Sequence, residues 1–489
     1  MIKATVIDLD IRHTLPPAAK KKIVAILGAK NCLDKPEDLT LYEYDGSVDK
    51  TRPDLVVFPR TTEEVAAVVK VAAEYDVPLV GRGAGTGLSG GAIPRAGGLT
   101  IAFSRMNKIL EIDIPNERAV VQPGVVNLDI STAVAPFGYF YAPDPSSQRA
   151  CTIGGNVAEN SGGPHTLAYG VTTNHVTGIE FVTPAGDVVF TGGKELDCPG
   201  LDVLGLLTGS EGTMVLVTKV VVRLMRNPER VKTILAVYNT VAACADTVAE
   251  ITARAITPVA LEMMDAEMLR MVEATCHAGY PLDAAAVLLI ELEGPVEAVE
   301  EQTEQIQEAC LRLGAREVRV AKSQEERDLL WKGRKNAFGA VGQMSPSSYT
   351  QDGVVPRMQV APALRFITQV SEKYGLRIAN VFHAGDGNLH PIILFNNRIP
   401  GELDKVKAAG EEILNFCIDC GGSITGEHGV GMEKNEIMSR LFSPDSLDCM
   451  AGFKAVFDPE GRLNPGKVLP TGHGCLEIRQ APLNRGSAV

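Results

Sequence analysis

The segment HAGDGNLH (383–390) places two histidines on either side of an Asp-Gly pair, a spacing that can support metal or acid–base chemistry. Asp386-Gly387 favours a two-residue hairpin turn, because both positions tolerate positive φ. With the turn there, His383 lies directly opposite His390. Opposed side chains leave the same face with Cβ atoms about 4.5–5.5 Å apart. Two neutral imidazoles so placed can bind one divalent metal, such as zinc, manganese or iron.

Glu427 and His428 follow downstream in the glycine-rich segment GSITGEHG and can complete this site. Three protein ligands, His383, His390 and Glu427, leave positions open, which is the pattern of a catalytic metal site. A metal there would bind a substrate hydroxyl and lower its pKa. His428, with an ordinary pKa of about 6.5, is then suited to act as the general base. The same groups can also hold a substrate by hydrogen bonds without a metal.

The loop GRGAGTGLSGG (81–91) is the richest glycine cluster in the chain. Gly85, Gly87 and Gly90 spell GxGxxG, but a Rossmann turn must open a helix. Here proline and further glycines follow, and then a strand at 99–103. We therefore expect no Rossmann turn, although the backbone N–H groups of such a loop can still converge on a phosphate.

Two more clusters of glycine and small residues follow, at 142–163 and 209–213, between short predicted strands. Several such loops joined to one sheet system predict a backbone wrapped closely round a large, flat, polyanionic cofactor.

The 489-residue chain has an ordinary globular composition, with room for two or three domains. Its net charge of −13 argues against nucleic acid and against direct binding to an anionic bilayer. No apolar run approaches the roughly 20 residues of a spanning helix, and the first ten residues show no export signal. Ten cysteines without a disulfide rhythm favour a reducing cytosol. Cys417 and Cys420 form a lone CxxC that we interpret as buried structural thiols.

The hydrophobic pattern predicts two differently built halves. The first half has strands at 54–59, 77–81 and 99–103, a helix at 62–76 opened by the Thr61–Glu64 capping box, and a hairpin at 178–193. After residue 228 strands and helices alternate, as in an α+β layer with an antiparallel sheet. Its strands are expected at 233–238, 257–264, 286–294 and 316–321, and its helices at 240–254, 265–275, 295–313, 323–340, 402–420 and 445–456.

The motifs PRTTEEV, GRGAGTGLSGG, PDPSS-x5-IGGN-x3-NSGG and TGSEGT stand in the order found in the PCMH-type FAD domain of the vanillyl-alcohol oxidase family, which this chain resembles. GRKNAF, DG-x2-PR, NVFHAGDGN, GEHG and NPGK resemble the FAD-linked oxidases that act on D-2-hydroxy acids. Within these, the motifs look most like the FAD-containing catalytic subunits of bacterial glycolate-oxidising complexes. The resemblance covers about residues 40–470.

The resemblance implies a non-covalent FAD, since Thr86 stands near the place where covalent relatives carry a histidine. The implied cofactor-binding residues are Arg82, Gly83, Ala84, Gly85, Thr86, Gly87, Pro143, Asp144, Ser146, Ser147, Gly154, Gly155, Asn156, Asn160, Gly162, Glu211, Gly212 and Asn464. His165 is expected either near the flavin edge or on a surface loop.

The resemblance also assigns Arg334 to the substrate carboxylate, whereas the residues alone suggest a helix-surface arginine. Substrate contacts are further expected from His383, His390 and Asn388. Relatives that oxidise D-2-hydroxyglutarate bind a second carboxylate with a lysine, but residues 336–356 contain no Lys or Arg. Phe338 stands where those relatives have a threonine. We therefore expect a small monocarboxylate, glycolate first and D-lactate as the alternative.

The expected protein is an FAD-dependent 2-hydroxy-acid dehydrogenase. The chain has no cluster-binding cysteine set, so the reduced flavin must pass its electrons elsewhere. The resemblance implies that FAD-binding and iron–sulfur partner subunits carry them towards a quinone. It is expected in the cytoplasm, at the inner face of the membrane through these partners. The less favoured alternative is a non-catalytic flavin relay subunit.

The expected fold class is α+β, with a two-subdomain PCMH-type FAD domain, an α+β cap and a helical C-terminal segment. The expected division is an N-terminal helical arm at 1–50, the FAD domain at 51–228, the cap at 229–420 and a C-terminal segment at 421–489 that completes the site.

Overall fold

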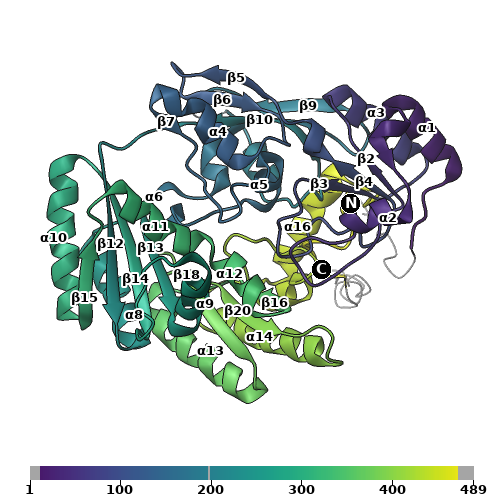
Figure 1. Ribbon diagram of the computed structural model, residues 1–489. Coiled ribbons are helices and arrows are strands. Elements are labelled where there is room, and N and C mark those ends of the chain that lie inside the picture. Colours follow the sequence, from purple (N-terminus) through teal and green to yellow (C-terminus); the bar gives the residue numbers. More distant parts are fainter. Residues whose placement is uncertain (1–11, 196–198, 472–489) are drawn as a thin grey trace, which may run out of the picture.

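The computed structural model describes residues 12–195 and 199–471. The start of the predicted N-terminal arm and the end of the predicted C-terminal segment lie outside the described residues. Figure 1 shows an N-terminal region with two main sheets, a second region built on one large sheet, and a C-terminal segment that returns to the first region. The expected α+β class is confirmed.

The chain opens with a four-stranded sheet of order β1-β2-β4-β3, in which β2 and β3 run parallel to β4. The elements are α1 Pro17–Leu27, β1 Cys32–Leu33, α2 Pro36–Leu39, β2 Leu55–Val57, α3 Thr62–Glu74, β3 Leu79–Arg82 and β4 Leu99–Ala102. The side chain of Thr61 accepts a hydrogen bond from Glu64 N and begins α3 where the capping box predicts it. Residues 83–98, all described, contain no helix, so the Rossmann turn is absent as expected.

The next sheet is antiparallel, with the order β5-β6-β10-β8-β9. Its region contains β5 Ile109–Asp113, β6 Arg118–Val121, α4 Asn127–Val134, β7 Tyr139–Phe140, α5 Ile153–Glu159, α6 Thr166–Tyr169, β8 Val176–Val182, β9 Val188–Gly192, α7 Val203–Leu207, β10 Leu216–Arg223 and β11 Met225–Arg226. The predicted hairpin at 178–193 is β8 and β9, which pair Gly178 with Gly192. Apolar side chains of α4 and α5 pack on this sheet and fix the start of α5 beside the first sheet's glycine loop.

The second region, the cap, is a nine-stranded sheet with the order β15-β12-β14-β13-β18-β19-β17, in which β20 also pairs with β18 and β16 pairs with β20. Its strands are β12 Arg230–Tyr238, β13 Ala260–Asp265, β14 Ala286–Gly294, β15 Ala315–Val320, β16 Ser347–Thr350, β17 Gly353–Val354, β18 Arg377–His383, β19 Asn388–Leu389 and β20 Pro391–Phe395. All its pairings are antiparallel, as predicted.

Helices cover both faces of the cap sheet. They are α8 Val241–Ala253, α9 Ala266–Cys276, α10 Val296–Arg312, α11 Gln324–Lys335, α12 Ala337–Met344, α13 Val360–Tyr374 and α14 Glu402–Asp419. One apolar core lies under α8, α10, α13 and α14, and a second lies under α9, α11 and α12. The single helix predicted at 323–340 is two helices that meet at Asn336.

The C-terminal segment contains α15 Met438–Leu441 and α16 Pro444–Phe457. It then extends the first sheet, because Leu79 N donates to Arg462 O at 2.8 Å and Asn464 N donates to Leu79 O at 2.7 Å. Figure 1 shows α16 close to β3 and β4. The expected domain boundaries stay a prediction.

Within the described residues, no helix combines the length and the apolar character needed to cross a membrane. The eight cysteines of the described part are all free. Cys417 is buried at the end of α14, as expected, whereas Cys420 is only partly buried.

Candidate active site and flavin pocket

The hairpin predicted at 383–390 forms, but the predicted register was wrong. β18 pairs His383 with Asn388, and residues 384–387 form a four-residue turn. His390 therefore lies diagonal to His383 along the ladder and not directly opposite it.

The turn is longer than predicted because another segment of the same chain binds its backbone. Asp386 is not among the residues with positive φ, whereas Gly387 has φ +78°, so the turn with two positive φ values does not form. Arg357 Nε donates to Gly385 O at 2.6 Å. Val355 N donates to Gly387 O at 3.0 Å. These contacts come from a segment about thirty residues upstream, which the local turn pattern does not report.

The two histidines converge despite the changed register. Their ring centroids lie 5.1 Å apart, with an interplanar angle of 85°. Glu427 Oε1 lies 3.2 Å from His383 Nε2 and 3.4 Å from His390 Nε2. One ligand atom from each side chain lies within 4.8 Å of the other two. Sequence reasoning therefore identified a set of residues that the fold brings together from the cap and from the C-terminal segment.

Glu262 on β13 fixes the ring of His383, and sequence reasoning missed it. Glu262 Oε1 lies 2.7 Å from His383 Nδ1, and its Oε2 accepts from Arg334 Nε at 2.7 Å. A carboxylate on Nδ1 directs Nε2 of His383 towards Glu427, an arrangement typical of metal-binding histidines. Although burial opposes its charge, Glu262 and Glu427 raise the pKa of His383 well above its ordinary value.

Asp352, which sequence reasoning also missed, positions the loop that carries Glu427 and His428. Its Oδ2 accepts backbone N–H bonds from Gly426, Glu427 and His428 at 3.0, 3.2 and 2.9 Å. The Asp352 side chain is fully buried. Burial opposes its charge, yet His428 and Lys434 hold its pKa well below the ordinary range. The anion fixes the direction in which the loop presents its side chains.

His428 stacks on His390, with ring centroids 4.8 Å apart and an angle of 14°. Its Nδ1 is buried and has no hydrogen-bond partner within the described chain. Burial is the largest effect and lowers the pKa of His428 to about 4. The ring is therefore neutral near pH 7 and can accept a proton.

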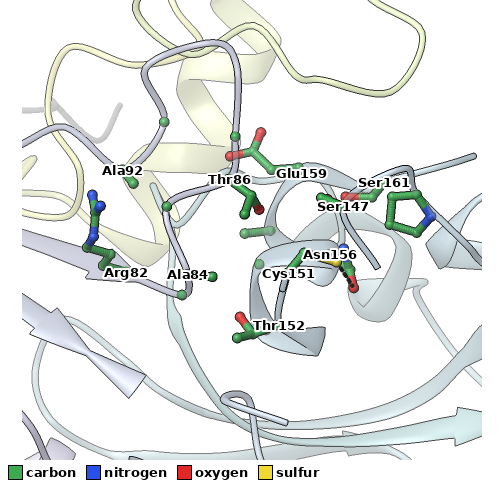
Figure 2. Close-up of a pocket in the computed structure, with 18 of the residues that line it drawn as sticks. Arg82, Ala84, Thr86, Ala92, Ser147, Cys151, Thr152, Asn156, Glu159 and Ser161 are labelled. Atoms are coloured by element: carbon green, nitrogen blue, oxygen red, sulfur yellow. Dashed lines mark hydrogen bonds between the residues drawn. The ribbon is translucent and has the colours of Figure 1, made fainter. Parts of the chain in front are cut away.

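A cavity of about 480 Å³ lies beside these groups, and Glu427 and His428 form part of its wall. The glycine loop, the start of α5, the GSEGT loop and the junction of α11 and α12 form the rest. Figure 2 shows the labelled residues Arg82, Ala84, Thr86, Ala92, Ser147, Cys151, Thr152, Asn156, Glu159 and Ser161.

The wall of the cavity suits FAD. Arg82 Nη1 and Thr152 Oγ1 are buried and find no partner within the described chain, so both can bind a ligand. The glycines allow the loop to pack closely against neighbouring side chains of the cavity wall. A Cβ on Gly83 would lie 2.3 Å from Thr152 Oγ1. A Cβ on Gly85, which has φ +72°, would lie 2.2 Å from Arg82 Nη2. A cation beside tightly folded backbone is what a pyrophosphate requires.

Most of the expected cofactor residues line this cavity. They are Arg82, Gly83, Ala84, Gly85, Thr86, Gly87, Ser146, Ser147, Gly154, Gly155, Asn156, Glu211 and Gly212. Pro143, Asp144, Asn160, Gly162 and Asn464 are not part of the lining.

Two of the five residues outside the lining stabilise the cavity wall through hydrogen bonds. Asn464 Nδ2 donates to Gly91 O at 2.9 Å and to Glu211 O at 2.7 Å, so it joins two cavity loops. Asn160 Oδ1 accepts from Thr173 N at 2.8 Å and ends α5. A residue can thus belong to a cofactor motif because it shapes the loop.

Arg334 is almost fully buried and also lies outside the cavity lining. It contacts Glu262 and is therefore not the helix-surface arginine that the residues alone suggested, while its role towards the substrate carboxylate stays a prediction. Arg334 Nη1 is buried and unpartnered within the described residues. Phe338, which sequence reasoning used to argue for a small substrate, lines the cavity, and its ring centroid lies 6.3 Å from that of His390. Lys335, which sequence reasoning did not assign to the cavity, lines it as well.

His165 joins the N-terminal region to the cap. Its Nδ1 lies 3.0 Å from Asp144 Oδ2 and its Nε2 lies 3.3 Å from Glu291 Oε1. The ring packs on Trp331, 5.3 Å away. Burial lowers its pKa, but Asp144 and Glu291 outweigh this and raise the pKa of His165 to about 10. His165 is therefore a charged bridge between the two regions and not the surface-loop residue of the alternative.

Comparison with known proteins places the chain in a family. Residues 53–192 match the FAD binding domain, and residues 227–468 match the C-terminal domain of FAD linked oxidases. The chain belongs to the FAD-linked oxidase family and is an FAD-dependent oxidoreductase.

Within the family, it is 48% identical to the glycolate oxidase subunit GlcD of Escherichia coli K12, with 92% of this chain and 90% of that one covered. It is 42% identical to GlcD of Bacillus subtilis, covering 92% and 96%. It is 34% identical to a D-lactate dehydrogenase of Anaerostipes hadrus, covering 86% and 90%.

Two solved structures share the fold. A p-cresol methylhydroxylase with bound substrate aligns with a TM-score of 0.78 at 19% identity, covering 92% of this chain and 96% of that one. A 4-ethylphenol oxidase of Gulosibacter chungangensis aligns at 0.78 and 17%, covering 94% and 99%. They confirm the expected PCMH-type architecture.

Proposed function

We propose that the chain oxidises a small 2-hydroxy monocarboxylate, with glycolate as the first candidate and D-lactate as the alternative. One observation carries the proposal: Glu427 and His428 line the same cavity as the glycine loop. Groups able to bind and deprotonate a hydroxyl thus share a wall with the groups expected to hold FAD. The names of the relatives, glycolate oxidase subunit and D-lactate dehydrogenase, support this class of substrate.

FAD, when bound, accepts the hydride that leaves the α-carbon of the substrate. Arg82 and the backbone of 83–87 are expected to hold its pyrophosphate, and residues 154–156 at the start of α5 its flavin end. Thr86 offers no covalent bond to the flavin, so we propose that FAD is bound non-covalently.

His428 is the proposed general base. Its neutral ring has an unpartnered Nδ1, and stacking on His390 fixes the ring plane. Proton transfer to a positioned base typically contributes about 10²–10⁴-fold to a rate. Asp352 holds the backbone of this residue, so it positions the base without touching the substrate.

We further propose a divalent metal, zinc, manganese or iron, on His383, His390 and Glu427. Such an ion would lower the pKa of the substrate hydroxyl. The donor set supports it: with Nδ1 of His383 bound to Glu262, its Nε2 offers a lone pair towards Glu427 when the ring is neutral. The competing arrangement is a charged His383 between two carboxylates, with no metal.

A chelator separates these arrangements. If a metal is bound, prolonged dialysis against the chelator should slow flavin reduction while FAD stays bound, and one of the three ions should restore the rate. A metal-free preparation with an unchanged rate would contradict the metal proposal.

A small substrate suits the cavity near the base. Phe338 occupies the wall beside His390 and reduces the space for a second carboxylate. Arg334 Nη1, buried and without a partner within the described chain, remains the proposed group for the substrate carboxylate, and Asn388 Oδ1 is likewise unpartnered.

We propose that electrons leave through FAD-binding and iron–sulfur partner subunits to a quinone, with the chain in the cytoplasm at the inner face of the membrane. The word subunit in the names of the GlcD relatives supports an assembly. The alternative, a relay subunit without its own substrate, does not need His428.

The test replaces His428 with Asn and measures flavin bleaching by glycolate without oxygen. FAD should stay bound while bleaching slows about 100-fold or more. His277→Asn is the matched control, because His277 is exposed and its φ of +50° is one that asparagine tolerates. Equal rates in both variants would remove His428 from the reaction.

A further inference from the structure

Glu159, the last residue of α5, places a carboxyl group in the wall of the flavin cavity. Figure 2 shows this group beside Thr86 of the glycine loop. Its Oε2 is buried and has no hydrogen-bond partner among the residues described. Two glycines make the space: a Cβ would come within 2.5 Å of Oε1 at Gly91 and 2.3 Å of Oε2 at Gly429.

A second carboxyl group, Glu211, lies next to it. The same Cβ position on Gly429 is 2.3 Å from Glu159 Oε2 and 2.8 Å from Glu211 Oε1. Glu211 receives two backbone hydrogen bonds, from Val430 N at 2.6 Å and from Gly431 N at 2.7 Å. Backbone N–H donors favour the ionised form of a carboxyl group. Burial raises the pKa of Glu211 as well, but these two donors oppose the rise, and Glu159 has no such donors among the described residues. Glu211 is therefore the member of the pair that ionises first.

The other charged groups around Glu159 do not change which of the two carboxyl groups, Glu159 or Glu211, keeps its proton. Asp45 adds a third acidic group, and Lys434 and Lys467 supply two cations. Burial is the largest effect on Glu159, and with Glu211 and Asp45 it raises the pKa of Glu159 well above the ordinary value. Lys467 already donates to Ile93 O at 2.6 Å, and Lys434 donates to Gly429 O. Within the described residues, neither lysine donates a hydrogen bond to Glu159, so neither holds its ionised form directly.

We propose that Glu159 is a neutral carboxylic acid whose O–H donates a hydrogen bond to FAD, so that cofactor binding requires this proton. The proposal rests on FAD occupying the cavity. FAD carries a pyrophosphate with two negative charges and many acceptor atoms. An ionised Glu159 would repel the pyrophosphate and offer FAD no hydrogen-bond donor. A protonated Glu159 carries no charge and offers its O–H as a donor.

As a consequence, the affinity for FAD should depend on the protonation of Glu159. Above the pKa that Glu159 has in the FAD-free protein, binding must first protonate the group. The affinity of FAD should then fall by up to about tenfold per pH unit, with net proton uptake on binding. Below that pKa the affinity should not depend on Glu159 ionisation.

The experiment titrates FAD into the FAD-free full-length protein by calorimetry from pH 6 to pH 9. Buffers of different ionisation enthalpy report the protons taken up. Wild type should take up protons and lose affinity as the pH rises. Glu159→Gln keeps a donor that cannot ionise, so it should bind FAD within a few-fold of wild type at pH 6, more tightly at pH 9, and without that uptake.

Glu433→Gln is the control, because Glu433 is another largely buried acid, with a pKa raised to about 7, outside the flavin cavity. It should keep the wild-type linkage. A Glu159→Gln protein with the wild-type proton uptake would overturn the proposal, and so would a wild-type affinity that does not change with pH together with no protonated-carboxyl band lost in Glu159→Gln. Failure of wild type to bind FAD at any pH would instead overturn the cofactor assignment on which it rests.

An infrared spectrum of the FAD-loaded protein gives a second readout that needs no removal of FAD. One protonated-carboxyl band should be present in wild type and in Glu433→Gln and be lost in Glu159→Gln. Its presence unchanged in the variant would contradict a proton on Glu159.

Discussion

Replacing Glu262 with Gln should affect stability and the active site together. Glu262 is almost fully buried and contacts two groups, His383 Nδ1 and Arg334 Nε, each at 2.7 Å. The neutral amide leaves the buried guanidinium of Arg334 without its counter-charge. The amide has a single acceptor oxygen, which cannot serve both His383 and Arg334, so His383 loses the charged acceptor that directs it towards Glu427. The first effect acts on the folded state and the second on the reaction.

Removing one partner of a buried ion pair typically costs about 3–5 kcal/mol. An unfolding entropy of roughly 2.1 cal/mol/K per residue makes this a loss of at least about 3 °C in Tm, and more if the cap unfolds separately. Losing a carboxylate that orients a ligating histidine typically costs about 10–100-fold in metal affinity or activity. Thermal unfolding and anaerobic flavin reduction on one preparation measure both effects.

Glu317→Gln is the matched control, since Glu317 is an exposed carboxylate on β15 of the same sheet. It should change Tm by less than about 1 °C and leave the rate unchanged. If Glu262→Gln behaved like the control in both assays, the proposed role of Glu262 would be wrong. A loss of stability with an unchanged rate would limit Glu262 to a structural role.

Three further predictions concern other parts of the molecule. His165→Gln should lower Tm most near pH 6 and least near pH 10. The raised pKa of His165, about 10, contributes stability that is complete below about pH 6.5 and is lost as the pH rises through 10. A difference in Tm that does not change with pH would contradict a charged bridge. Gly431→Ala should weaken FAD retention, since the residue has φ +57° and a Cβ would lie 2.0 Å from Ser89 O, whereas Gly452→Ala, which meets nothing within 4 Å, should not. Phe338→Ala should raise the relative flavin-reduction rate with larger 2-hydroxy acids over glycolate, because the ring fills the wall beside the proposed metal-binding histidines; an unchanged preference would place the specificity elsewhere.

The glycine loops and their role were predictable from the sequence because their signal is local. A residue that must take positive φ, or allow close backbone approach, is glycine whatever lies elsewhere in the chain. Gly83 and Gly85 show this directly, since a Cβ on either would meet a cavity side chain. The predicted strand at 286–294 has the same bounds as β14 for a similar reason: its apolar run fills two cores.

The hairpin register was not predictable from the turn residues. The Asp-Gly pair favours a two-residue turn, but hydrogen bonds from Val355 and Arg357 stabilise a four-residue turn. The histidines still converge, because diagonal neighbours on one sheet face, roughly 7–8 Å apart, remain within reach of long side chains, and both rings contact Glu427.

Glu262 and Asp352 were missed for a different reason. Each is a single acidic residue next to apolar or small neighbours, and such a residue reads as a polar position facing solvent. Their partners lie far away in sequence, at His383 for Glu262 and in the loop 426–428 for Asp352. A charged residue inside an otherwise apolar strand, such as Glu262 in β13, was the available signal for a buried partner.

The oxidation of a small 2-hydroxy acid is tested most directly by the flavin itself. The purified protein, with its bound FAD and without oxygen, is mixed separately with glycolate, D-lactate, L-lactate and D-2-hydroxyglutarate, and the loss of flavin absorbance is followed. We expect fast bleaching by glycolate or D-lactate and poor bleaching by D-2-hydroxyglutarate. A preparation with bound FAD that none of these acids bleaches would contradict the proposed reaction and leave the relay alternative.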